Sequence, residues 1–191
     1  MSSPQAASAC RIAALPAAVL SLTAALRSAG TAAGSARSAS HYAATSRVED
    51  LTAGAFLSVV GETDERIATG TGVDRVLLCS GRVYYALAEE RAERGDTSTA
   101  IIRLEQLYPL PEAELAEALA PYADAELVFV QDEAANQGIW PWLALHVPAS
   151  LTGGRQMRLV SPPEAASPAV GSAGAYRAQQ AALRAAAFDR D

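Results

Sequence analysis

A short apolar run ends in the tripeptide Ser80-Gly81-Arg82, whose residue types suit anion binding. If a strand ends here and a helix follows, free N–H groups at the helix start and the Arg82 guanidinium would together hold an anion. The alternative is a simple turn in which Arg82 is solvated. Gly70-Thr71-Gly72 precedes the run, on the wrong side for phosphate, and the glycine-rich dinucleotide fingerprint is missing.

Two adjacent carboxylates, Asp132 and Glu133, follow a second apolar run. General acid–base catalysis needs two groups that converge on one substrate, whereas consecutive side chains usually point apart. We therefore favour a structural or interface role for this segment. The interface candidates are Gln131, Glu133, Asn136 and Trp140. Of the pair Trp140 and Trp142, we expect one to pack inside the domain and the other to belong to a contact surface.

Residues for nucleophilic catalysis or metal binding are scarce. No Ser-His-Asp set can be argued, because His146 is the only histidine after residue 45. Cys79 ends an apolar run and is most simply a small buried side chain. With Cys10 as the only other cysteine and no Cys/His cluster, a disulfide scaffold and a structural zinc site are excluded. We predict no catalytic residue and no metal ligand in this chain.

Composition narrows the class of protein further. The chain has 191 residues, 50% hydrophobic and 19% charged, with a formal net charge of −6. A negative chain with only 6% aromatic residues argues against nucleic-acid binding. No apolar run reaches the roughly 20 residues that a membrane span needs. We therefore expect neither nucleic acid nor a membrane among the partners.

The first 45 residues differ from the rest. Residues 1–48 contain four of the arginines and no acidic residue, whereas all 21 acidic residues follow them. An Ala-, Ser- and Arg-rich segment without acids is typical of an organelle transit peptide. The alternatives are a disordered or weakly helical appendage and an artefact of the start codon or reading frame. We divide the chain into an irregular extension, residues 1–45, and a domain, residues 46–191.

Strands and helices should alternate from residue 73 onward. Short runs rich in Val, Ile and Leu predict buried strands, and apolar residues at helical spacing predict helices. Gly95 should stop one helix, and Pro111 should sit in the first turn of another. The expected strands are 73–79, 99–104, 126–130 and 156–160, and the expected helices are 83–94, 112–119, 138–147 and 176–188.

This alternation predicts an α/β domain with a mainly parallel sheet flanked by helices. In such sheets, functional groups gather beyond the carboxyl ends of the strands. The residues at these ends are Ser80–Arg82, Glu105-Gln106, Gln131–Glu133 and Ser161.

Five motifs follow one another in this part of the chain: GAFLSVVG at 54–61, VLLCSGRVYY at 76–85, IRLEQLYP at 102–109, VQDEAANQGIW at 130–140 and ASPAVG at 166–171. In their order and spacing they resemble the C-terminal domain of the thiamine-diphosphate-dependent first component of 2-oxoglutarate dehydrogenase. That group includes the multifunctional 2-oxoglutarate decarboxylases. Residues 1–40 share no such similarity.

The resemblance implies a transketolase-type C-terminal domain that packs against catalytic domains and a dimer partner. The family decarboxylates 2-oxoglutarate on thiamine diphosphate with Mg²⁺, in the tricarboxylic acid cycle. The succinyl unit then passes to a lipoyl group on the second component. Because the family binds its cofactors in upstream domains, we expect this chain to bind none alone. It should be an inactive fragment, or a subunit completed in trans.

Two further expectations stay open. One alternative is a stand-alone anion-binding, effector-binding or docking module without catalysis. The location should be cytoplasmic in a bacterium, or mitochondrial if residues 1–45 are a transit peptide.

Some bacterial members of the family bind acetyl-CoA at this domain. The resemblance carries their polar contacts onto Ser58 and Gln106, which join Arg82 as effector-binding candidates. Their basic contacts fall on Ala55, Ala113 and Glu114, which cannot bind phosphate. Each missing charge-assisted contact loses about 1.5–3 kcal/mol of binding energy. We therefore expect weak or absent control by acetyl-CoA.

Overall fold

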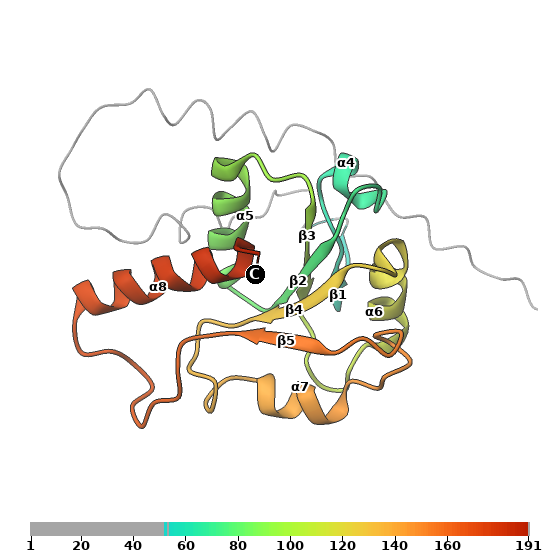
Figure 1. Cartoon of the computed structure of the whole chain (residues 1–191). Helices are drawn as coiled ribbons and strands as arrows, with labels where there is room; N and C mark the ends of the chain where they lie inside the picture. Colours follow the sequence, from blue (N-terminus) through green and yellow to red (C-terminus); the bar gives the residue numbers. More distant parts are fainter. Residues whose placement is uncertain (1–51, 53, 191) are drawn as a thin grey trace, which may run out of the picture. The chain divides into compact units, whose positions relative to one another are not determined.

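The computed structural model describes Thr52 and residues 54–190, so the expected extension, residues 1–45, lies outside the described residues. The elements are β1 (Val59–Val60), α4 (Glu65–Ala68), β2 (Arg75–Cys79), α5 (Val83–Arg94), β3 (Thr99–Leu104), α6 (Glu112–Leu119), the 3₁₀ turn η2 (Ala120–Tyr122), β4 (Glu126–Val130), α7 (Trp140–His146), β5 (Met157–Val160) and α8 (Ala173–Phe188) (Figure 1). The predicted α/β class is confirmed.

The five strands form one sheet in the order β1-β3-β2-β4-β5. β2 pairs in parallel with both β3 and β4, and β4 pairs in parallel with β5. Cys79 at the end of β2 lies opposite Arg103 and Val130, so the carboxyl ends of the central strands share one edge of the sheet. β1 is antiparallel to β3, which brings its preceding residue, Ser58, to this carboxyl edge.

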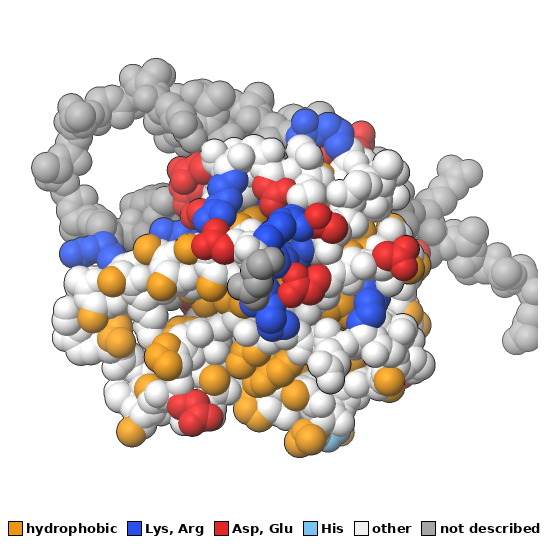
Figure 2. Space-filling view, viewed as in Figure 1, with side chains coloured by type: hydrophobic (Ala, Val, Ile, Leu, Met, Phe, Trp, Pro, Cys, Tyr) orange, Lys and Arg blue, Asp and Glu red, His pale blue; other side chains and the backbone are white. Residues whose placement is uncertain are grey.

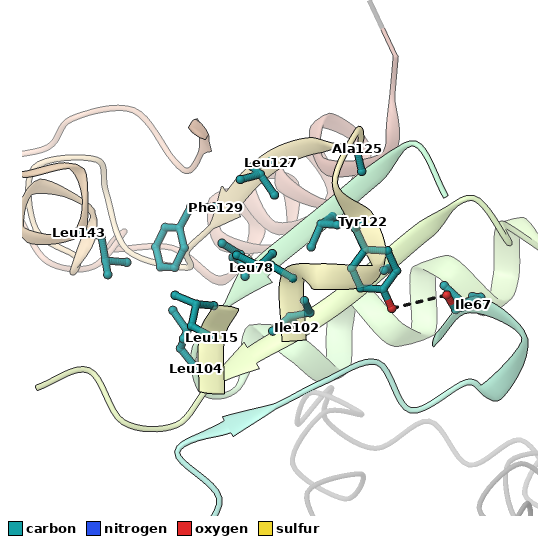
Figure 3. Close-up of a cluster of buried hydrophobic side chains, with 13 residues drawn as sticks. Ile67, Leu78, Ile102, Leu104, Leu115, Tyr122, Ala125, Leu127, Phe129 and Leu143 are labelled. Atoms are coloured by element: carbon teal, nitrogen blue, oxygen red, sulfur yellow. Dashed lines mark hydrogen bonds between the residues drawn. The ribbon is translucent and has the colours of Figure 1, made fainter. Parts of the chain in front are cut away.

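Successive residues of the central strands point to opposite faces of the sheet, and each face has its own core. One core joins Leu78, Ile102 and Phe129 to side chains of α4, α6 and α7 (Figure 3). The other joins Leu77 and Val128 to side chains of α5 and α8. Burial on both faces explains why these strands read as continuous apolar runs.

Local signals set most helix boundaries. Gly95 takes the left-handed conformation that ends α5, as predicted, with φ of 64°. Pro111 is the N-cap of α6, one residue before the helix that it was expected to start. Ser172 accepts a hydrogen bond from the N–H of Ala175, so α8 begins three residues before the expected 176. Neither β1 nor α4 was expected.

The Cys79 thiol is fully buried, and its Sγ lies 3.8 Å from the carbonyl oxygen of Ile102. Burial disfavours the thiolate and raises the pKa of Cys79 to about 12. In a Cys10→Ser variant, a thiol reagent at pH 8 should therefore label Cys79 only after denaturant is added. Labelling of the native variant at the rate of a free thiol would contradict this burial.

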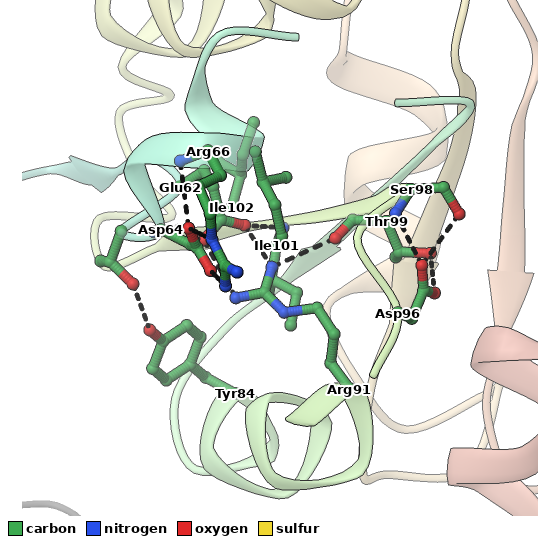
Figure 4. A network of polar contacts seen from close by, with 12 residues as sticks. Glu62, Asp64, Arg66, Tyr84, Arg91, Asp96, Ser98, Thr99, Ile101 and Ile102 are labelled. Carbon is green, nitrogen blue, oxygen red and sulfur yellow. Dashed lines mark hydrogen bonds and ion pairs between the residues drawn. The ribbon is translucent and has the colours of Figure 1, made fainter. Parts of the chain in front are cut away.

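A buried ion pair links the segment before α4 to α5 and β3 (Figure 4). The Glu62 side chain is 1% exposed, and its two oxygens lie 2.5 and 3.0 Å from the guanidinium nitrogens of Arg91. The same carboxylate accepts the backbone N–H groups of Asp64 and Ile101, each at 2.8 Å. Glu62 is therefore fully hydrogen-bonded despite its burial.

Arg75 fixes the end of the chain to the start of the central strand. Its Nε donates to Glu126 at 2.7 Å, and its Nη1 donates to the carbonyl oxygens of Ala187 and Asp189. Arg158 donates to the other Glu126 oxygen at 2.8 Å. Figure 2 shows charged side chains gathered on this face around the end of the chain. Glu126 thereby connects β2, β4 and β5.

This network predicts a loss of stability in acid. Burial raises the pKa of Glu126, but the hydrogen bonds from Arg158 and Arg75 outweigh burial and hold the pKa below its ordinary value. A carboxylate with a lowered folded pKa stabilises the fold above its ordinary pKa and loses that contribution as the pH falls through the folded value. We expect the free energy of unfolding of Glu126→Gln, measured by urea denaturation, to fall less steeply than that of the wild type as the pH is lowered. The matched change Glu117→Gln, at an exposed position of α6, should leave this acid dependence unchanged.

Candidate functional site

Three polar side chains meet at the carboxyl edge of the sheet. Arg82 is the N-cap of α5, Asp132 follows β4, and Tyr176 lies in the first turn of α8. One guanidinium nitrogen of Arg82 donates to Asp132 Oδ2 and to Tyr176 Oη, both at 2.7 Å. The hydrogen bond to Tyr176 and the carboxylate of Asp132 raise the pKa of Arg82. This cluster ties α5 and α8 to the end of β4.

The cluster changes what Arg82 offers to a ligand. Its side chain is 50% exposed, which leaves nitrogen atoms accessible for an anion. An incoming anion would, however, share the guanidinium with the Asp132 carboxylate, so the local charge is already balanced. The other carboxylate oxygen, Asp132 Oδ1, is buried without a hydrogen-bond partner among the described residues. The cluster therefore leaves Asp132 Oδ1 unpartnered inside the domain and part of the Arg82 guanidinium accessible to an anion.

The structure brings the other two effector-binding candidates together on the β1–β3 side of the edge. The carbonyl oxygen of Ser58 accepts the N–H groups of Glu105 and Gln106, at 2.9 and 3.0 Å. The Gln106 side chain donates to the carbonyl oxygen of Pro109 at 2.8 Å. Arg82 makes its side-chain hydrogen bonds toward β4 and α8 instead. Effector binding by this trio stays a prediction.

Gln131 organises the loop between β4 and α7. Its side chain is inside the domain, with the residue 3% exposed, and donates to the carbonyl oxygens of Glu133 and Ala134. Its Oε1 accepts the backbone N–H of Trp140 at 3.1 Å. Gly138 passes so close that a Cβ there would lie 2.3 Å from this Oε1. Gln131 thus shapes the loop from within, whereas its role in an interface stays a prediction.

Gly138→Ala should loosen this loop, because the methyl group and the Gln131 amide cannot occupy the same space. We expect a loss of about 1–3 kcal/mol in the free energy of unfolding, the usual cost of overpacking. Amide hydrogen exchange of Trp140 should also accelerate. Gly61→Ala is the matched control, since a Cβ at Gly61 meets no atom within 4 Å. Equal stability of the two variants would contradict the packing of Gly138 on Gln131.

The exposed face of the same loop carries the remaining interface candidates. Glu133 and Asn136 are exposed, and Asn136 exchanges hydrogen bonds with the backbone of Ala165, each at 3.1 Å. These bonds hold the loop against the segment that leads from β5 to α8. Whether this face contacts another protein stays a prediction.

The two tryptophans are both half-buried but have different neighbours. Trp140 stacks on Phe129 of the core, with ring centroids 6.2 Å apart. Trp142 stacks on His146 at 4.6 Å and meets Tyr108 edge-on at 6.1 Å. Both tryptophans pack against the core that contains Phe129, and Trp142 differs only in also contacting the exposed Tyr108 and His146, so a contact-surface role for one of them stays a prediction.

The described residues, Thr52 and 54–190, contain no group of three or more His, Cys, Asp or Glu side chains that could hold a metal ion. None of the helices in this part of the chain is both long and apolar enough to cross a membrane.

The fold and this edge define an α/β domain whose parallel strands end in paired polar side chains. The model of the family described as 2-oxoglutarate dehydrogenase C-terminal matches residues 45–188. The chain belongs to this family, which confirms the resemblance.

Named relatives agree with this assignment. The chain is 42% identical over 146 residues to a 2-oxoglutarate dehydrogenase E1 component of Cupriavidus necator, and this match covers 76% of this chain and 15% of the relative. It is 40% identical over 149 residues to a 2-oxoglutarate dehydrogenase E1/E2 component of Corynebacterium glutamicum, and this match covers 77% of this chain and 12% of the relative. It is 46% identical over 112 residues to a multifunctional 2-oxoglutarate metabolism enzyme of Mycolicibacterium vanbaalenii, and this match covers 57% of this chain and 9% of the relative. The chain therefore spans less than a sixth of the length of these relatives.

Proposed function

We propose that this chain supplies the C-terminal domain of a 2-oxoglutarate dehydrogenase first component and is inactive without the rest of that enzyme. The observation that carries the proposal is the family match, which covers residues 45–188 and thus nearly the whole described fold. The relatives named E1 component are much longer, since the matched region is 15% of the Cupriavidus necator protein. The remainder would come from another polypeptide, or would be missing if this chain is a fragment.

The coenzyme of the proposed reaction would be thiamine diphosphate with Mg²⁺, and thiamine diphosphate would supply the electron sink for the loss of carbon dioxide from 2-oxoglutarate. The described residues do not fit a magnesium diphosphate. Two carboxylates at the carboxyl edge, Asp132 and Glu105, are paired with Arg82 and Arg103, and Glu133 is exposed on the loop after β4, so the described residues of this edge present no cluster of free carboxylates for a metal ion. We therefore assign the coenzyme to the remainder of a complete enzyme and give this chain no catalytic residue.

The proposed partners follow from the same assignment. They are the catalytic domains, a second first-component subunit in a homodimer, and the lipoyl-bearing second component that receives the succinyl unit. The enzyme would act in the tricarboxylic acid cycle, in the cytoplasm of a bacterium, and the organisms of the relatives support that setting. Glu133 and Asn136 offer exposed polar groups on a loop that Gln131 holds in shape.

A complementation assay tests the proposal. The Cupriavidus necator relative would be prepared without its matched C-terminal region and mixed with this chain, thiamine diphosphate, Mg²⁺ and 2-oxoglutarate. We expect carbon dioxide release from the mixture and none from this chain alone. Release by this chain alone would overturn the proposal, as would a mixture no more active than the truncated relative.

The second candidate is an effector-binding module without catalysis, and the half-exposed Arg82 at the start of α5 favours it. Calorimetric titration of the chain with acetyl-CoA separates the two. We expect no binding in the micromolar range, because Ala55, Ala113 and Glu114 provide no positive charge. Micromolar binding that Arg82→Gln abolishes would favour the module.

A further inference from the structure

An apolar surface covers the outer side of α7 and the neighbouring end of the loop after β3. Tyr108 is 81% exposed and Leu145 is 82% exposed, both unusually high for such large apolar side chains. Trp142 connects them, because it meets the Tyr108 ring and lies one helical turn before Leu145. Figure 2 shows apolar side chains with few charges over α7, in the lower part of the view. We call Tyr108, Trp142, Leu145 and His146 the α7 surface.

A second exposed apolar pair lies nearby along the backbone. Phe56 is 74% exposed and Leu57 is 58% exposed. They directly precede Ser58, whose carbonyl oxygen accepts the N–H of Gln106, two residues before Tyr108. The segment that enters the domain and the α7 surface therefore meet at the start of the loop 105–110. Large exposed apolar patches mark interaction sites in soluble proteins.

From this arrangement we infer that the α7 surface, with Phe56 and Leu57, is where the catalytic part of a 2-oxoglutarate dehydrogenase first component docks. The inference rests on the proposed function. The family match begins at residue 45, and the region is the C-terminal one, so in longer relatives the preceding chain enters next to Phe56 and Leu57. That preceding chain makes up most of the 85% of the Cupriavidus necator relative that this chain does not match. It is a body of protein large enough to cover the surface.

The surface also specifies the chemistry of its partner. The exposed side chains of the α7 surface are Tyr108, Leu145 and His146, and with Phe56 and Leu57 they include no acidic side chain and no arginine. The partner should therefore present an apolar patch rather than a charged one. Tyr108 and Leu145 are the expected anchors, because they are the most exposed large apolar side chains of the described residues and so bury most surface when covered.

A chimera tests this inference in a full-length enzyme. The matched region of the Cupriavidus necator relative would be exchanged for residues 45–188 of this chain, and activity on 2-oxoglutarate measured with and without Leu145→Glu or Tyr108→Ser. We expect Leu145→Glu to lower activity about 30-fold, the loss that an interface anchor gives, and Tyr108→Ser to lower it less. The matched control is Ala92→Glu, which adds the same charge at an exposed position of α5 and should leave activity unchanged.

Measurements on the isolated 191-residue chain distinguish a folding defect from a docking defect. Both surface variants should keep the circular dichroism spectrum and unfolding midpoint of the wild type, because both side chains are exposed.

Three outcomes would overturn the inference. If the chimera is active and both Leu145→Glu and Tyr108→Ser keep its activity within twofold, the proposed function stands and the docking inference is wrong. If the chimera is inactive without either substitution, both the proposed function and the docking inference are wrong. A dimer of the isolated chain that Leu145→Glu dissolves assigns the surface to a second copy instead.

Discussion

Arg91→Met should lower the free energy of unfolding by about 3–5 kcal/mol, the range for removing one partner of a buried ion pair. The substitution leaves the Glu62 carboxylate buried at 1% exposure with its charge uncompensated. The two backbone N–H groups that remain cannot replace a guanidinium that donates to both oxygens. Urea unfolding followed by circular dichroism at pH 7 measures the effect.

Two further variants test whether the loss in free energy of unfolding comes from the unpaired charge of Glu62. Glu62→Gln combined with Arg91→Met should be more stable than Arg91→Met alone, because the buried group is then neutral. Arg66→Met removes an ion pair whose arginine is 74% exposed, and it should leave the midpoint unchanged. If Arg91→Met behaved like Arg66→Met, the Glu62–Arg91 pair would be no more than a surface contact.

Phe129→Ala should be comparably damaging. Phe129 is fully buried on β4, and truncating a buried phenylalanine to alanine costs about 3–5 kcal/mol through lost burial and the cavity left behind. The change should also alter the near-ultraviolet spectrum, because Trp140 loses the ring on which it stacks. Phe56→Ala, at a ring that is 74% exposed, is the matched control for stability. A loss below about 1 kcal/mol for Phe129→Ala would contradict its place in the core.

The central elements could be predicted because their signals are local. β3 and β4 have the expected bounds, since each is an apolar run buried on both faces of the sheet. α5 also ends where expected, because Gly95 adopts a conformation that most other residues avoid. β1 was missed because two residues carry no periodicity. The single turn of α4 was missed for the same reason, although Asp64 caps it.

The side-chain pairing at the carboxyl edge could not be predicted from spacing. Arg82 was an evident candidate, but its partners Asp132 and Tyr176 lie 50 and 94 residues further along the chain. Gln131 was named as an interface candidate, whereas its side chain is buried and binds the loop backbone from within. The one available signal was Gly138, whose missing side chain leaves room for the buried amide. Long-range pairing of this kind depends on topology, which a single sequence does not state.

The short outer strand β1 has a consequence for aggregation. An edge strand with a long row of unpaired backbone groups can template the addition of a foreign strand. β1 contributes only Val59 and Val60, paired with Leu104 and Arg103. Such an edge is too short to seed fibril-like growth, so any fibril that extends this sheet backbone to backbone should start at the opposite margin, along β5.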